Sequence, residues 1–513
     1  MPEAMEEQAK RPGPAGLPAL LGLAGASLAM ELEATVHAIA IVSAASSLRM
    51  NGAERALAAS ICTLCIAASI LATGSLGDRL GRKRIMMLGL VASMAGGVIT
   101  ALATSAAQFA AGRALSGLGF AASFGLSFAL LPAIAPEPAA LARAIARWLA
   151  LQGIGIVVLC LVGGYLAGVS WRLAYLLSPA VAGFALLLCL RTVPEARNPA
   201  PGPFDAPGLL LVAVGLVGTL YGISNAASAG WTSMRVLVPL LVGFAVLIAF
   251  ALWEWRRPQP ALPVRSFADP QLMAGALASI AFNVAIAVVL LQLSLLWQYV
   301  YRYKPVEVSL GQLPLILACI IAAGWAGSLV ARGVPMRRLT ALGLLAMAAA
   351  MVALGFAGAS APYIVFALPL AMAGAGMMLT QAPAAHAFVA KAPPALVGAI
   401  ASSRTAFGQF GYALGLALSS SLVYGMFPPL LRERMKEAGA TPAEQGQALG
   451  IVQSWVQTHD VSGFDARLVR EVVDSGASAY LASYRTTMLI MAGLIALGAG
   501  LCFWVLSRRR PSS

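Results

Sequence analysis

Three ionisable side chains near the start of the chain have a spacing that suggests proton chemistry. Glu31, Glu33 and His37 lie within one long apolar segment. If this segment is a helix, Glu33 and His37 are one turn apart on a shared face, and Glu31 points elsewhere. A charge at the centre of a bilayer costs roughly 2.5–3.5 kcal/mol on insertion scales. Because burial favours the protonated form of a carboxyl group, such a group can exchange a proton near neutral pH, as a proton-coupling site must.

A fourth ionisable residue, Arg113, lies in a later apolar segment that also contains Gly117 and Gly119. Small residues allow helices to approach closely. A buried guanidinium needs a carboxylate, a carbonyl or a water-filled cavity, and Glu33 is its natural partner. The functional interpretation is proton or substrate coupling. The alternatives are a lone structural arginine, acidic side chains that only snorkel or bond a neighbouring helix, and a histidine satisfied in the interior.

A second group of polar residues in apolar segments could line a substrate cavity. This group comprises Asn283, Gln292, Gln381 and Arg404. The sequence contains no phosphate-binding loop, no nucleophile elbow and no cluster of metal ligands. We therefore expect no enzyme activity, no cofactor and no metal site.

The composition indicates the elements that must position these residues. The chain has 513 residues, of which 60% are hydrophobic and only 11% are charged. Because soluble domains carry roughly 25% charged residues, this chain is expected to be an all-α integral membrane protein. A spanning helix needs about 20 apolar residues. Fourteen candidate spans follow: 18–44, 54–75, 85–105, 109–134, 145–168, 173–191, 207–226, 235–254, 272–299, 309–331, 338–357, 362–386, 396–424 and 486–507.

The net charge of +14 is explained by topology rather than by nucleic-acid binding. Most basic residues fall in alternate connections between the spans, which places both termini in the cytoplasm of a bacterial-type inner membrane. The expected organisation is a cytoplasmic tail (1–17), a six-helix bundle (18–191), two further helices (207–254), a second six-helix bundle (272–507) and a cytoplasmic tail (508–513). The expected partners are a small-molecule substrate, protons and lipid, and the chain could act as a monomer.

The connection between the second and third spans is a dense charge cluster, since residues 74–84 read GSLGDRLGRKR. Gly74, Gly77 and Gly81 are expected to let the chain turn. Asp78 could cap the third span or pair with a basic residue from another helix. The basic residues of the cluster hold the turn on the cytoplasmic side, and these are Arg79, Arg82, Lys83 and Arg84.

Several segments resemble the major facilitator superfamily. Residues 74–84 resemble its loop signature G-x-L-x-D-R-x-G-R-K-R. Residues 32–40, LEATVHAIA, resemble the first-helix motif L-D-x-T-I-V-N-V-A of its fourteen-helix drug:proton antiporter branch, with Glu33 in the acidic position. Arg113 and Gly117 match the fourth-helix motif R-x-x-x-G, and residues 170–172 resemble its S-W-R. The resemblance implies two six-helix bundles with two inserted helices, proton coupling that involves Arg113, and a gating role for the 74–84 loop.

The chain departs from the family pattern in its fifth span. The family motif there is G-P-x-x-G-G, whereas residues 159–164 read LCLVGG, so Gly163 and Gly164 remain and the proline is missing. Gly155 keeps a small face earlier in the same helix. Removing a proline restores a backbone donor and straightens a helix, so antiport could be altered or lost. In the thirteenth span, Gly408 replaces the usual arginine, and Arg404 could substitute for it.

The polar segment 425–485 is expected to form an external cap of amphipathic helices. Residues 441–444 read TPAE, which is a capping box with proline at the first helical position, and residues 462–465 are expected to start a second short helix.

The leading hypothesis is secondary active, proton-coupled efflux of small amphipathic or cationic compounds. A metabolite symporter or uniporter is the alternative suggested by the missing proline. An alternative of another class is a non-transporting membrane sensor or assembly protein.

Overall fold

The computed structural model describes residues 16–50, 52–197, 204–257, 260, 262–391, 397–458 and 463–507, which are almost entirely helical and contain no strand. The expected tail 508–513 and nearly all of the expected tail 1–17 lie outside the described residues. Many helices begin where a short polar side chain interrupts apolar sequence. Ser105, Ser170, Asp205, Ser233 and Asp269 each accept a hydrogen bond from the first turn of the helix that follows. These N-caps satisfy amide groups that have no partner within the helix.

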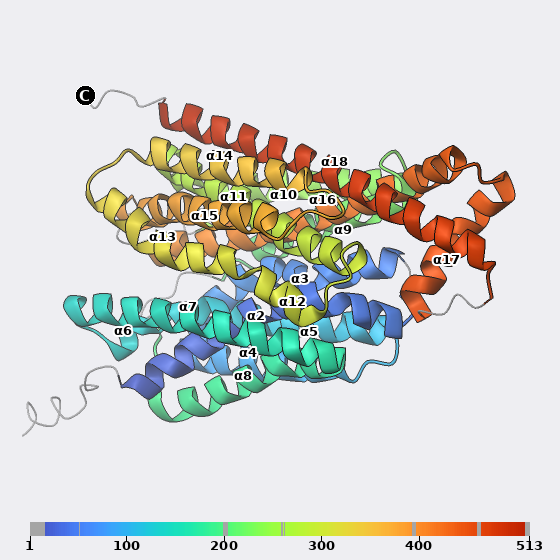
Figure 1. The fold of residues 1–513 in the computed structure, drawn as a ribbon. Helices are drawn as coiled ribbons and strands as arrows, with labels where there is room; N and C mark the ends of the chain where they lie inside the picture. The colour runs from blue at the N-terminus through green and yellow to red at the C-terminus, as the bar shows by residue number, and fades with distance from the viewer. Residues whose placement is uncertain are drawn as a thin grey trace, which may run out of the picture.

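The first half of the chain forms one helical bundle, drawn in blue to green in Figure 1. Within it α2 packs against α5, α7 and α8, while α4 packs against α5 and α8. Its helices are α2 (Leu17–Ser47), α3 (Gly52–Leu80), α4 (Arg82–Ala101), α5 (Ala106–Ala129), the short α6 (Leu131–Ile134), α7 (Pro138–Val169) and α8 (Trp171–Thr192).

The second half forms another bundle, in which α11 packs against α15, α16 and α18, and α14 packs against α15 and α18. Its helices are α11 (Pro270–Tyr299), α12 (Pro305–Gly311), α13 (Leu313–Ala331), α14 (Met336–Gly355), α15 (Ile364–Ala390), α16 (Val397–Glu437), α17 (Pro442–Thr458) and α18 (Ala466–Ser507). A 3-10 turn, η1 (Val264–Ala268), precedes α11.

Two inserted helices lie between these bundles along the chain, α9 (Ala206–Ala229) and α10 (Met234–Arg256). They pack against each other. α9 also contacts α3 of the first bundle and α16 of the second. The hydroxyl of Ser421 donates to the carbonyl of Ile223, and Leu220 is fully buried beside Ala413. α9 therefore bridges α3 and α16, and α10 packs on α9.

Thirteen helices of the described residues are long and apolar enough to cross a membrane. The expected span at 109–134, the fourth along the chain, is the one missing from this set. It corresponds to α5, which has 24 residues but is less apolar, because it contains Arg113 and several glycines and serines. α5 nevertheless packs along α3 and α4. The all-α membrane fold is confirmed, while the number of fourteen crossings stays a prediction.

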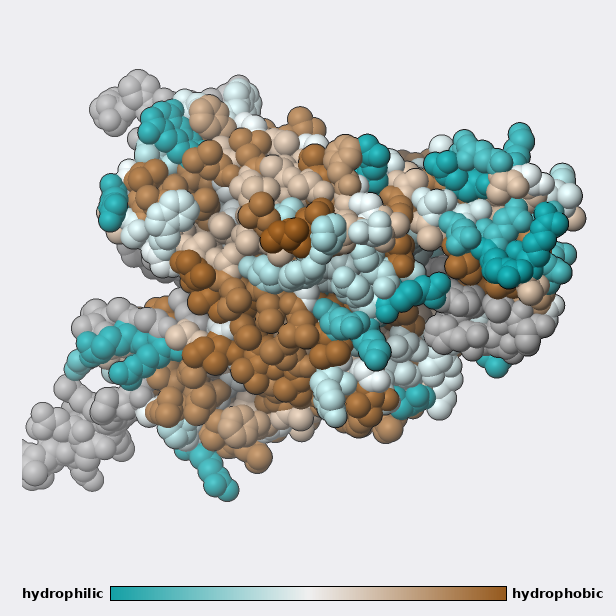
Figure 2. All heavy atoms as spheres, viewed as in Figure 1, coloured by the Kyte–Doolittle hydropathy of each residue, from teal (hydrophilic) through white to brown (hydrophobic). Residues whose placement is uncertain are grey.

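The outer surface fits a lipid environment. Large apolar side chains are exposed on α9, α10, α13 and α18, for example Leu210, Leu241, Ile321 and Leu497. In Figure 2 apolar residues cover the middle of the visible face, and hydrophilic residues gather mainly toward its two ends. A surface of this kind is stable only against hydrocarbon.

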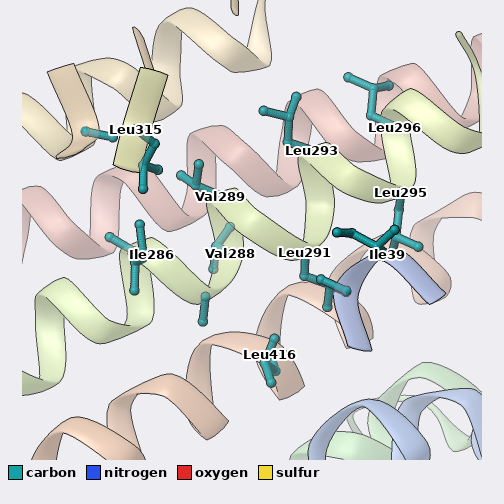
Figure 3. Close-up of a cluster of buried hydrophobic side chains, with 14 of the residues drawn as sticks. Ile39, Ile286, Val288, Val289, Leu291, Leu293, Leu295, Leu296, Leu315 and Leu416 are labelled. Atoms are coloured by element: carbon teal, nitrogen blue, oxygen red, sulfur yellow. The ribbon is translucent and has the colours of Figure 1, made fainter. Parts of the chain in front are cut away.

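The two bundles meet through apolar side chains at the end of the molecule that carries α17. Figure 3 shows Ile39 of α2 next to Leu291 and Leu295 of α11. The hydroxyl of Ser294 on α11 donates to the carbonyl of Ala38 at 2.7 Å. Because Ile39 is fully buried, this part of the junction excludes solvent.

The external segment differs from the expectation in two respects. α16 continues to Glu437 in spite of Pro428 and Pro429, and α18 runs unbroken from Ala466 into the last span. A helix does start at the expected place, since Asp465 accepts from the amides of Arg467 and Leu468. The expectation that this helix is short was wrong, because it continues over 42 residues. A small core explains the continuity, since Leu431 on α16, Ile451 on α17 and Val472 on α18 pack together. The predicted capping box is confirmed, because Thr441 and Glu444 exchange hydrogen bonds at the start of α17.

Candidate functional site

The polar cluster at the centre of the first bundle is built on α2, α5 and α8. Glu33 and His37 lie one turn apart on α2, and Arg113 points toward them from α5. Gly117, one turn along α5, lies against the backbone carbonyl of Cys62 on α3, so even a methyl group there would collide with it. Close helix contacts of this kind bring the charged groups together in the bundle interior.

Glu33 and Arg113 form a buried ion pair between Oε1 and Nη1. The side chains are only 4% and 3% exposed, respectively. The second carboxylate oxygen of Glu33 and Nε of Arg113 are buried without a hydrogen-bond partner. Removing one member of such a pair leaves an uncompensated buried charge, which costs roughly 3–5 kcal/mol. The pair is thus sensitive to any event that neutralises the carboxylate, including protonation.

Tyr175 of α8 connects this ion pair to His37. Its hydroxyl lies 2.6 Å from Nδ1 of His37, and the Arg113 guanidinium lies 5.8 Å from the centre of its ring. Phe109 and Trp171 surround the ring with edge-to-face contacts at 5.3 and 6.2 Å. Tyr175 is not among the residues predicted from the sequence. The available signal was a tyrosine inside an apolar helix, because a buried phenol hydroxyl usually requires a partner.

Nε2 of His37 is the remaining free end of this polar group, since it is buried and has no hydrogen-bond partner. The group therefore runs from the carboxylate of Glu33 through Arg113 and Tyr175 to an imidazole nitrogen that could accept a proton. Glu31 does not join it. The carboxylate of Glu31 is half-buried on a different face of α2, and the hydroxyl of Thr35 donates to its backbone carbonyl at 3.1 Å.

Four further glycines lie at close helix contacts. A Cβ at Gly119 would strike the backbone of α4, and one at Gly155 would lie 2.5 Å from a methyl group of Leu28 on α2. A Cβ at Gly163 would lie 2.8 Å from a methyl group of Val36 on α2. Gly164 lies against Ser309 of α12, so it permits contact between the two bundles. α7 is unbroken from Pro138 to Val169, as expected for a helix without an internal proline.

The charge cluster at residues 74–84 is more helical than predicted. Gly74 and Gly77 lie inside α3, and the only break is Gly81, with φ of +114°. The expectation of a turn over the whole cluster was therefore wrong, because α3 continues to Leu80 and α4 starts at Arg82. A single glycine suffices, since it can adopt a backbone conformation that other residues avoid.

Asp78 pairs with Arg82 at 2.8 Å rather than capping α4. Glu195, from the segment after α8, supplies the cap instead. Its carboxylate accepts from the backbone amides of Lys83 and Arg84 at 2.9 and 3.3 Å. An acceptor at this position satisfies free amides and interacts favourably with the helix dipole.

The basic side chains of the same cluster bind the ends of neighbouring helices. Arg82 donates to the carbonyl of Ala129 at the end of α5, and Lys83 donates to the carbonyl of Leu190 on α8. The guanidinium of Arg79 lies 5.4 Å from the ring centre of Phe204, just before α9. The cluster is thus anchored to the first bundle and to the connection that leads to the inserted helices.

The residues expected to line a substrate cavity occupy several positions in the second bundle. Gln292 is fully buried and donates to the hydroxyl of Ser419, while Asn283 donates to the carbonyl of Ser279. Gln381 on α15 and Arg404 on α16 are half-buried. Gln292 and Asn283 therefore stabilise α11 and its contact with α16, and the half-buried residues Asn283, Gln381 and Arg404 retain some exposed surface.

Comparisons with known proteins place this architecture among transporters. The sequence profile of the Major Facilitator Superfamily matches residues 21–416. The puromycin resistance protein of Streptomyces alboniger is 30% identical over 428 residues, with 82% of this chain and 84% of that protein covered. The multidrug efflux pump LfrA of Mycolicibacterium smegmatis is 25% identical over 484 residues, with 94% of each covered.

Among solved structures, the fold is similar to a bacterial homologue of the human lysosomal transporter Spinster. The TM-score is 0.67 at 14% identity, with 96% of this chain and 98% of that chain covered. A peptide transporter of the POT family in an autoinhibited form gives a TM-score of 0.64 at 16% identity, with the same coverage. These two structures share the helical architecture described above.

Proposed function

The chain belongs to the Major Facilitator Superfamily, and from this premise we propose that it exports small amphipathic or cationic compounds in exchange for protons. It is a membrane transporter of small molecules, not an enzyme. The named activities of similar proteins, multidrug efflux and resistance to an antibiotic, support export.

The buried Glu33–Arg113 pair carries the proposal of proton coupling. A proton on Glu33 would remove the charge that compensates Arg113, so the proton-bound state favours a rearranged interior. Proton binding and substrate binding would each destabilise the other's bound state, as reciprocal linkage requires. We propose that His37, which shares a hydrogen bond with the hydroxyl of Tyr175, is a second proton-binding group close to the pair. Glu31, half-buried on another face of α2, is a second carboxylate for proton or substrate binding.

The 74–84 cluster is proposed to control the exchange between conformations. Its contacts with the ends of α5 and α8 would have to rearrange when α3 moves relative to them. Substrate would bind between the two bundles and would be released as they rock.

The decisive experiment is transport of a fluorescent cation into vesicles with an imposed proton gradient. We expect Glu33→Gln to abolish gradient-driven transport, because glutamine cannot exchange a proton. Glu433→Gln, an exposed substitution in the external part of α16, is the matched control and should transport at the wild-type rate. Unchanged gradient-driven transport by Glu33→Gln would refute coupling at this residue.

Symport or uniport of a metabolite is the second candidate, favoured by the unbroken α7. The direction of proton flux on adding substrate to vesicles separates it from antiport. Antiport moves protons against the direction of substrate movement, symport moves both the same way, and uniport moves no protons.

A further inference from the structure

A small cavity of about 20 Å³ lies between the two bundles, at the end of the molecule that carries α17. Side chains of α2 and α3 line it from the first bundle, and side chains of α11 and α16 line it from the second. Most of the lining is aliphatic. The polar groups are the guanidinium of Arg55 and the hydroxyls of Tyr299, Ser420 and Tyr424. A volume of this size holds a single water molecule or one ion of similar size.

Arg55 is a cation without a carboxylate partner in this cavity. Its Nε donates to the carbonyl of Met50 at 3.0 Å. None of the ion pairs found among the described residues involves Arg55, and no lining residue is acidic. A half-buried charge next to leucine and isoleucine side chains is costly unless an opposite charge compensates it.

The polar groups of the cavity also have the character of an anion site. A guanidinium has only donors, and a tyrosine or serine hydroxyl can donate one hydrogen bond. Ser420 is a buried lining residue that is 3% exposed. Arg55, Tyr299, Ser420 and Tyr424 therefore give the cavity lining four groups that can donate to one small acceptor.

We propose that this cavity binds one small inorganic anion of halide size, and that the bound anion holds the two bundles together at this end of the molecule. The donors come from α3 of one bundle and from α11 and α16 of the other, so the complete site exists only while the bundles touch here. A ligand that binds one conformation alone stabilises that conformation by mass action. The anion therefore opposes opening at this end.

The site is separate from the proton-coupling pair. On α2 it uses Ile41, Val42 and Ala45, which lie beyond His37 toward the end of the helix. Binding of the anion requires neither Glu33 nor a proton gradient. An experiment on anion binding can therefore fail without affecting the proposed function, and the reverse also holds.

Thermal unfolding of the detergent-purified full-length protein tests the proposal. Sodium bromide is compared with sodium gluconate at equal ionic strength, because gluconate is too large for the cavity. We expect bromide to raise the apparent melting temperature of the wild type by roughly 2 °C or more in a saturable manner. Arg55→Gln should lose this increase. Arg235→Gln removes an exposed arginine at the start of α10 and should retain it.

Two further measurements keep the test decisive. Tyr299→Phe and Tyr424→Phe should each weaken the apparent bromide affinity, and they carry the comparison if Arg55→Gln does not fold. Bromide-soaked crystals should show an anomalous peak next to the Arg55 guanidinium. Equal melting temperatures in bromide and gluconate would indicate that only water fills the cavity and would overturn the proposal. A bromide effect that survives in Arg55→Gln would also overturn it.

Discussion

At the scale of single residues, the main feature is a charge pair in a place where charges are costly. Glu33 and Arg113 compensate each other, and each also retains a buried polar atom without a partner. Such incomplete satisfaction is uncommon in protein interiors. Tyr175 and His37 extend the same polar group, so its properties depend on four side chains from three helices.

A double-mutant cycle tests how strongly the pair is coupled. We expect Glu33→Gln and Arg113→Gln each to lower stability, because each leaves one uncompensated charge. The double variant should be more stable than the sum of the single effects predicts, by roughly 3–5 kcal/mol. Thermal unfolding of the four proteins measures this coupling. Strictly additive effects would show that the two side chains do not interact.

At the scale of helices, close packing depends on a few glycines with specific neighbours. Gly117 lies against a backbone carbonyl of α3, and Gly119 lies against the backbone of α4. A backbone atom cannot move aside as a flexible side chain can. These glycines therefore determine how deeply α5 enters the bundle, and with it the position of Arg113.

Two substitutions in α5 separate packing from helix propensity. We expect Gly117→Ala to reduce folded yield and transport severalfold, because the new methyl group strikes Cys62. Gly125→Ala is the control in the same helix, since the nearest atom to its added Cβ, in Ile70, is 3.7 Å away. It should be neutral or slightly stabilising. The measurement is the yield of monodisperse protein together with the transport rate, and equal effects of both changes would contradict the packing role of Gly117.

The start of α9 is tied to the end of α10 through Asp205. Burial acts to raise the pKa of Asp205, but hydrogen bonds from the Trp253 indole and the Gly208 amide, contact with Glu254 and the charge of Arg257 lower it overall. A carboxyl group whose pKa is lowered by folding adds stability above its unfolded pKa, and this stability is lost as the pH falls through the folded value.

The lowered pKa of Asp205 predicts how the effect of Asp205→Asn on the melting temperature depends on pH. At pH 7 the variant should melt at a lower temperature than the wild type. The difference should shrink as the pH falls below about 4, where Asp205 of the unfolded wild type becomes protonated. Melting curves between pH 3 and pH 7 measure it, and a difference that is independent of pH would show that the charge of Asp205 is irrelevant.

At the scale of the whole molecule, the two bundles contact each other through several helices. The contacts between Ser294 and Ala38, and between Gly164 and Ser309, cross from one bundle to the other. α9 adds a second connection, since it packs on both α3 and α16. The described ends of the chain, at the start of α2 and the end of α18, lie at the opposite end of the molecule (Figure 1).

Reporter fusions test the predicted orientation in the membrane. Green fluorescent protein fused after Ser513 should fluoresce, because the C-terminus is predicted to be cytoplasmic. Alkaline phosphatase fused after Gly439, before α17, should be active because this segment is predicted to be external. The opposite pattern would invert the topology.

The sequence alone determined the membrane class, most helix positions and several helix starts. Long apolar runs and local signals such as the capping box at Thr441 lie within a few residues of one another, so they can be read without knowing the fold. The sequence also identified Glu33 and Arg113 as costly charges in apolar segments.

Only the tertiary structure decided which of these residues meet. Glu33 contacts Arg113 across 80 positions of sequence, Tyr175 joins His37, and Glu195 caps α4 instead of Asp78. The lengths of α16 and α18 likewise depend on their shared core with α17. The physical reason is that partners on different helices are selected by packing geometry, which local sequence does not encode.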